Sequence, residues 1–366
     1  EHGGIIIQSE RTGGVSTVQV KNTLTTTGSG NIFLKASSTG TNSVVVSKGA
    51  TITSGGQIEI VTNGTSNTIS LASGSNVTAE GNVLGSGTGT LILSDNIVTS
   101  GEINLKNGFS SNPMGVQLAA NVALKTTGSS KNIVLPAVNG NYALSLEATG
   151  TISTEAIGQA TPLSSLTVVN SAGTSFQGDF SAASVLLADS TNSISFSGNT
   201  LITTSLTTTA EPYGVSFAGA STLLAGAPVF LNTGTTSFSG NTSLTSGATI
   251  TGNATSTANL AGTIVFGGAF NIGTAGNIGL ISIANGTQLT LHSSSAISTF
   301  ANPIQINGNN PGTLNLLGVG TLTLSGDSSA STQSGDNINV TNGTLNVTGK
   351  VASAIALTNA TLRGEG

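Results

Sequence analysis

The chain has 366 residues, of which 37% are hydrophobic and only 6% are charged, and its net charge is −5 at pH 7. Because disordered chains combine low hydrophobicity with high charge, this composition predicts a folded protein. The lack of Cys excludes disulfides and thiolate metal sites, and the lack of Lys and Arg between Lys131 and Lys350 leaves that stretch unable to neutralise phosphates, so we expect no nucleic-acid partner.

Short aliphatic triplets in the N-terminal part of the chain predict β-strands. Val, Ile and Leu dominate them, whereas strong helix formers are scarce throughout the chain. Most triplets are spaced by about 11 to 14 residues and separated by Gly, Asn or Ser, which favours two strands in each coil of a repeating structure. The triplets are residues 32–34, 44–46, 58–60, 69–71, 91–93, 103–105 and 116–118.

A Ser-Phe-x-Gly motif then occurs four times at a near-constant step. Its aromatic residues are Phe176, Phe196, Phe217 and Phe238, so successive motifs lie about 20 residues apart. One ring at the same phase of each repeat is expected where every coil adds a side chain to an internal stack. We expect Phe266 to continue this structural core stack after an insertion.

The constant step predicts an all-β fold, a parallel β-solenoid with about 20 residues per coil and on the order of 18 coils. A propeller blade needs about 40 residues, and a sandwich would not keep one Phe phase over successive repeats. No run of about 18 apolar residues occurs, so we expect no membrane-spanning helix. Open coils present unpaired strand edges, which makes end-to-end or lateral self-association into fibres an expected partner mode.

The C-terminal part resembles the autotransporter-associated β-strand repeat of bacterial passenger domains. The resemblance lies in Gly318–Asp327 (GVGTLTLSGD) and Ile338–Val347 (INVTNGTLNV), and residues 360–366 are similar to the start of a further unit. The remainder is similar to filamentous-haemagglutinin-like passengers in composition and strand rhythm. We therefore divide one continuous solenoid segment of a longer chain into haemagglutinin-like coils (1–155), Ser-Phe-x-Gly coils (156–270) and an autotransporter-type repeat (271–366).

This resemblance implies a right-handed parallel β-helix exported by type V secretion from a Gram-negative cell. It also implies an extracellular or cell-surface location, with adhesion, aggregation or matrix formation as the role and host or matrix surface molecules as ligands. The chain shows neither a translocator barrel nor an N-terminal secretion domain, which leaves the export route open.

A β-helical enzyme acting on polysaccharides, a lyase or hydrolase, is the main alternative. Such enzymes cluster carboxylates on neighbouring coils, but Asp95, Asp179, Asp189, Asp327 and Asp336 are scattered, although the last two flank one turn. We expect no catalytic residue, no metal site and no cofactor. His292 follows an alternating strand and is expected to point outward. Irregular Thr arrays, such as residues 23–27 and 206–209, leave an ice-binding solenoid as a minor alternative.

Asn-x-Ser/Thr triplets recur along the chain and have two interpretations. They are typical of Asn turns that lead into Thr-rich strands, with stacked Asn side chains forming amide ladders. Glycosylation is the alternative. The candidate positions are Asn63, Asn76, Asn241, Asn253, Asn285 and Asn342, and further triplets begin at Asn339, Asn346 and Asn359.

Overall fold

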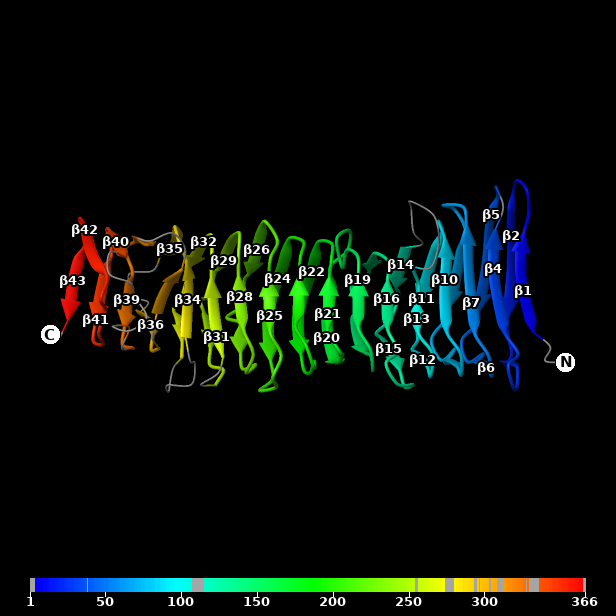
Figure 1. Ribbon diagram of the computed structural model, residues 1–366. Coiled ribbons are helices and arrows are strands. Elements are labelled where there is room, and N and C mark those ends of the chain that lie inside the picture. The colour runs from blue at the N-terminus through cyan, green and yellow to red at the C-terminus, as the bar shows by residue number, and fades with distance from the viewer. Residues whose placement is uncertain are drawn as a thin grey trace. The chain divides into compact units, whose positions relative to one another are not determined.

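The computed structural model describes residues 4–37, 39–106, 115–253, 256–273, 280–292, 295, 297–302, 304–307, 312–326, 328 and 336–364. Within these ranges the secondary structure is entirely β, and neighbouring strands pair in parallel (Figure 1). The predicted all-β parallel solenoid is therefore confirmed. The chain divides into two compact units, Glu1–Ala182 and Ala183–Gly366, which we describe separately.

Each full turn of the first unit has three faces, called A, B and C in the order in which the chain visits them. Face A consists of β1 (Ile5–Glu10), β4 (Ile32–Ser37), β7 (Ile58–Asn63), β10 (Val83–Gly87), β13 (Ile103–Asn104), β16 (Ile133–Leu135), β19 (Ile152–Thr154) and β21 (Thr174–Phe176). Face B consists of β2 (Val15–Val20), β5 (Thr41–Val46), β8 (Thr68–Leu71), β11 (Thr90–Leu93), β14 (Gly115–Leu118) and β17 (Val138–Asn139). Face C consists of β3 (Leu24–Thr25), β6 (Ile52–Ser54), β9 (Val77–Ala79), β12 (Ile97–Thr99), β15 (Val122–Thr126), β18 (Ala143–Glu147) and β20 (Leu163–Asn170).

The second unit has the same three-faced turn. Face A consists of β23 (Ile194–Phe196), β25 (Val215–Phe217), β28 (Thr236–Phe238), β31 (Thr257–Leu260), β34 (Leu280–Ala284) and β37 (Ile304–Asn307). Face B consists of the first half of β24 (Thr200–Thr208), then β26 (Ser221–Leu224), β29 (Asn241–Leu244), β32 (Thr263–Phe266), β35 (Thr287–Leu291), β38 (Thr313–Gly318), β40 (Asn337–Thr341) and β42 (Ala354–Thr358). Face C consists of the second half of β24, then β27 (Val229–Phe230), β30 (Ala248–Ile250), β33 (Phe270–Ile272), β36 (Ile297–Phe300), β39 (Thr321–Leu324), β41 (Thr344–Val347) and β43 (Thr361–Gly364). The remaining strand, β22 (Phe180–Leu187), spans the boundary between the units.

The turns have three strands instead of the predicted two. One turn carries the chain from Ile5 to its register partner Ile32 in the first unit, and from Val215 to its partner Thr236 in the second. Among the described residues, face A has eight strands in the first unit and six in the second, so the expected number of coils was too high. The third strand was not predicted because in many turns it is very short and is therefore hard to recognise in the sequence.

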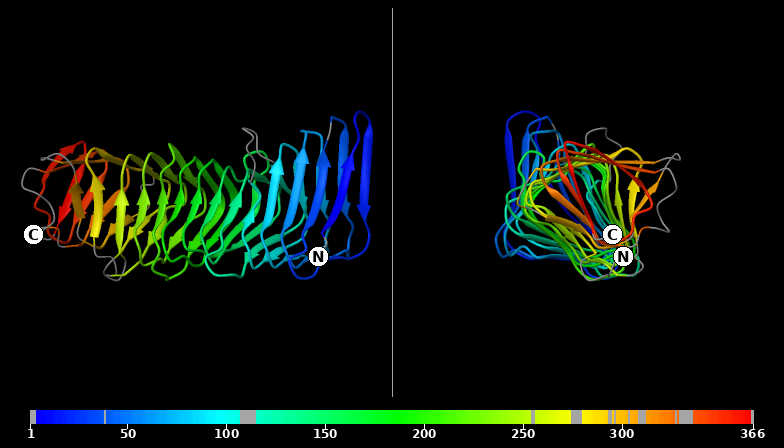
Figure 2. Two further views of the ribbon diagram at one scale, coloured as in Figure 1. Left: turned by 45° about the vertical axis from the view of Figure 1, so that its right-hand side comes forward. Right: turned by 90° about the vertical axis from the view of Figure 1, so that its left-hand side faces the viewer.

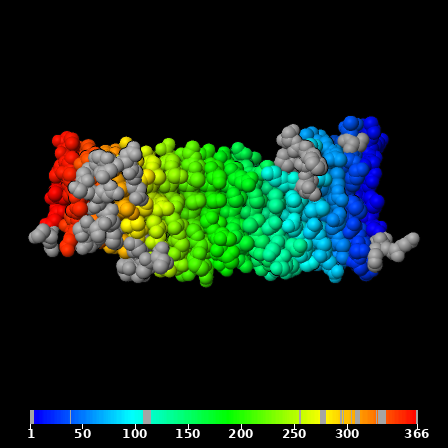
Figure 3. Space-filling view, viewed as in Figure 1, coloured from blue at the N-terminus to red at the C-terminus, as the bar shows by residue number. Residues whose placement is uncertain are grey.

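The core of each unit consists of columns of aliphatic side chains that are in register between turns. On face A of the first unit, Ile32, Ile58, Val83, Ile103 and Ile133 follow one another in register and are fully buried. Alternate residues point outward, as the two-residue period of a strand requires. Figure 2 shows the strands of successive turns lying side by side within each unit, and Figure 3 shows these turns packed closely together.

The Ser-Phe-x-Gly motif builds one edge of the turn in the second unit. The rings of Phe196 and Phe217 stack with centroids 4.9 Å apart, and those of Phe217 and Phe238 with centroids 5.4 Å apart. The Gly of the motif lies where the chain leaves face A, and a Cβ at Gly219 would collide with the backbone carbonyl of Gly198 one turn earlier. The motif thus combines an inward ring with a corner that only Gly can form.

One aromatic residue departs from the predicted stack. Phe266 lies on β32 of face B and is paired with Leu244 and Leu291, so it does not extend the column. Leu260 occupies the position after Phe238 instead. Phe176 lies on β21 in the first unit, where it is buried and packs edge-on against Phe180 with centroids 5.0 Å apart. Its place in the stack stays a prediction.

Candidate functional site

Two of the carboxylates considered for catalysis, Asp336 and Asp95, accept backbone hydrogen bonds, whereas Asp179 and Asp189 lie on either side of β22. Asp336 is 1% exposed and its Oδ1 accepts a hydrogen bond from the N–H of Gly312 at 2.8 Å. The Oδ1 of Asp95 accepts a hydrogen bond from the backbone N–H of Asn96, the next residue in the chain, at 2.7 Å. Asp327 lies outside the described residues, so its predicted approach to Asp336 stays a prediction. Within the described ranges no three His, Cys, Asp or Glu residues gather closely enough to hold a metal ion.

Three carboxylates of the first unit form ion pairs that connect turns. Glu147 and Lys125 are direct partners in register and lie 2.8 Å apart, and the other pairs are Lys35–Glu10 at 2.6 Å and Lys106–Glu155 at 2.9 Å. The hydrogen bond from Lys35, followed by that from Ser37, lowers the pKa of Glu10. All three pairs are partly solvated, so each contributes little to stability.

His292 directly follows β35 and is exposed, as the alternation of inward and outward side chains along that strand predicted. Its backbone N–H donates to the carbonyl of Phe266 at 3.0 Å, which continues the ladder between turns.

The Asn triplets lie mainly at exposed turns. Asn76, Asn342 and Asn359 have positive φ angles of 30°, 63° and 49°, a backbone region that Asn tolerates better than most residues. Asn339 donates to the side chain of Asn315 at 3.0 Å, which is one rung of an amide ladder between turns. The turn and ladder interpretation therefore describes these four positions. All six glycosylation candidates, Asn63, Asn76, Asn241, Asn253, Asn285 and Asn342, are exposed, and glycosylation at them stays a prediction.

The feature that the sequence analysis missed is an apolar surface on the last described turn, formed by β42 and β43. Leu345 is fully buried, but its partner in register, Leu362, is 46% exposed. Val340 is 1% exposed, and its partner Leu357 is 43% exposed. Two core columns thus reach the surface on this turn. The alternation of apolar and polar residues in β42 and β43 could be recognised in the sequence, but the exposure of the apolar side chains could not.

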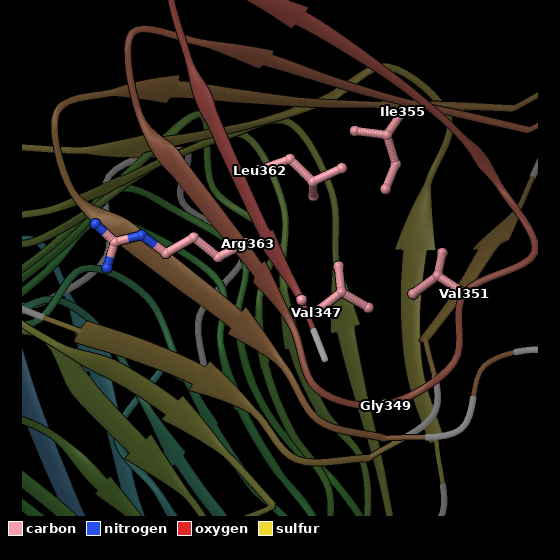
Figure 4. Close-up of a pocket in the computed structure, with 7 residues that line it drawn as sticks. Val347, Gly349, Val351, Ile355, Leu362 and Arg363 are labelled. Atoms are coloured by element: carbon pink, nitrogen blue, oxygen red, sulfur yellow. The ribbon is translucent and has the colours of Figure 1, made fainter. Parts of the chain in front are cut away.

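Leu362 also lines a hollow of about 410 Å³ on the same turn. It is lined by Val347, Gly349, Val351, Ile355, Leu362, Arg363 and Gly364. Figure 4 shows Ile355, Leu362, Val347 and Val351 pointing into a common space, whereas the guanidinium of Arg363 points away from it. Such a lining has no acid, base or nucleophile and is suited to receiving aliphatic side chains.

The backbone of the last turn is paired on one side in the described structure. β42 pairs with β40 and β43 pairs with β41. The opposite edges of β42 and β43 carry donors and acceptors that a further parallel strand can satisfy. The unpaired strand edges and the exposed apolar columns together form what we call the terminal surface. It consists of β42, β43 and the hollow between them.

Comparison of the chain with known protein families, with curated proteins and with solved structures found no match. The described residues also contain no helix long and apolar enough to cross a membrane. The stacked parallel strands define the class of the protein as a β-solenoid.

Proposed function

We propose that this chain is a structural and adhesive segment of a bacterial surface or secreted protein, a stalk or fibre that supports adhesion, aggregation or matrix formation. The observation that carries the proposal is the core of in-register columns, which in the second unit continue on faces B and C to the terminal surface. In a stacked fold each turn contacts only its neighbours, so length and stability grow together.

The outward side chains support the same role. On face A of the second unit the outward column contains Ser195, Ser216, Ser237, Asn259 and Ser282, all uncharged. Equivalent positions on adjacent turns lie about 4.8 Å apart, a distance at which like charges repel. Neutral columns allow many turns to be stacked without this cost. An extracellular location and surface ligands follow from the resemblance to passenger domains and belong to this proposal.

A cleavage screen tests the structural role against the enzymatic alternative. The chain is incubated with polygalacturonate and other polysaccharides, with and without Ca²⁺, and new reducing or unsaturated ends are measured. We expect none. Reproducible cleavage would instead favour a β-helical lyase or hydrolase. Thermal hysteresis of the chain in ice would favour the ice-binding alternative.

The terminal surface allows a second test of the structural role. A variant in which residues 350–366 are repeated after Gly366 should place a further turn on β42 and β43. We expect slower amide hydrogen exchange in both strands, because their free edges become paired. The control carries Asp in the repeat at the positions equivalent to Ile355 and Leu362. Equal protection by both extensions would contradict apolar docking.

A further inference from the structure

The outward surface of face B in the second unit differs from that of face A. Its central column is in register over seven turns and contains four large aliphatic side chains, Leu201, Leu223, Val265 and Leu317. The other three members are Ser243, Thr290 and Thr341. All seven side chains point outward and are half-buried.

No charge interrupts this surface in the part of the second unit that the structure describes. The neighbouring outward column contains Ser221, Asn241, Thr263, Gln288 and Asn315. The charged residues of the described second unit are Asp189, Glu211, Asp336, Lys350 and Arg363, and none of them belongs to either column. A neutral surface with a central aliphatic column favours contact with another protein.

We propose that face B of the second unit binds face B of a second copy of this chain, with the two stacks parallel and in register. The side chains of face B repeat from turn to turn about every 4.8 Å, and only a partner that is also a stack of strands repeats its side chains at this spacing. Parallel pairing places each aliphatic side chain of the column opposite its own copy and each polar one opposite a polar one. Antiparallel pairing centred on Val265 places Leu201 opposite Thr341. The parallel arrangement thus buries more aliphatic surface and is isologous, as in most dimers.

The size of the surface determines the strength of the contact. Seven turns about 4.8 Å apart and strands about 13 Å long give roughly 400 Å² per copy, or about 800 Å² in total. Stable interfaces bury about 1,200–2,000 Å². One pair of chains therefore associates weakly, and the contact becomes effective where many copies are close together. This inference deepens the proposed structural role and rests on it.

Sedimentation velocity of the full chain over a wide concentration range tests the inference. We expect reversible dimers at high micromolar concentration and at least a tenfold weaker association for L223K. The matched control is S216K, which adds the same charge to face A of the same turn and should leave association unchanged. Melting temperatures of both variants identify any loss of folding. A wild-type chain that stays monomeric, or equal losses in both variants, would overturn the inference.

Mixing charge variants tests the register. L223K mixed with L223E should restore the dimer, because parallel pairing places residue 223 of one copy opposite residue 223 of the other. Antiparallel pairing would instead be restored by mixing L223K with L317E, and that result would overturn the parallel arrangement. Failure of these tests leaves the stalk role standing, whereas polysaccharide cleavage would remove the stalk role without affecting the dimer.

Discussion

Replacing Phe217 with Ala opens a gap in the middle of an aromatic column. The Phe217 ring is 1% exposed and lies between Phe196 and Phe238, at centroid distances of 4.9 and 5.4 Å with nearly parallel planes. Phe230 also contacts it edge-on at 6.2 Å. Truncating a fully buried Phe costs about 3–5 kcal/mol, and the narrow interior leaves few side chains that can move in to fill the space. We expect a loss of at least about 3 kcal/mol.

Amide hydrogen exchange is the appropriate assay, because a stack of turns does not unfold as a two-state system. A loss of about 3 kcal/mol corresponds to roughly 100-fold faster exchange in the strands that carry the three rings. Phe217→Leu should cost clearly less, since Leu260 occupies the same column. Ser216→Ala, outward on the same strand, should change the exchange little. Unchanged exchange in Phe217→Ala would refute the internal stack.

Three further predictions concern single side chains. Gly219→Ala should destabilise the surrounding turns by more than the roughly 1 kcal/mol of ordinary helix or strand substitutions, because its Cβ would meet the carbonyl of Gly198; unchanged chemical unfolding would contradict this contact. Thr222→Val should stabilise the chain by about 1 kcal/mol, because the buried hydroxyl has no hydrogen-bond partner among the described residues, and a lower melting temperature would reveal a partner. Tyr213 is buried, which raises the pKa of its phenol, and it donates a hydrogen bond to the carbonyl of Leu187. A phenol whose pKa is higher in the folded chain than in the unfolded chain stabilises the fold at a pH below its unfolded pKa, and this contribution is lost as the pH rises through its folded pKa. Above about pH 10 the melting temperature should therefore fall less steeply in Tyr213→Phe than in the wild type.

The exposed core on the last turn could be predicted only in part. Leu345 and Leu362 follow the same alternation and have the same chemistry in the sequence, yet one is fully buried and the other is 46% exposed. Burial depends on whether a further turn covers the side chain, which no local pattern contains. The same limit applies to face B, because Leu223 and Leu224 are adjacent in the sequence and only the fold shows that Leu223 points outward.

By itself the sequence determined that the fold is a parallel stack of strands and that Phe196, Phe217 and Phe238 share one column. An aromatic residue that recurs at a near-constant step returns to the same environment only if each step is one turn. The number of faces and the place of Phe266 were decided by the tertiary structure. Both depend on where the chain turns a corner, and the corner at Gly219 is set by contact with Gly198, which is distant in the sequence and adjacent in space.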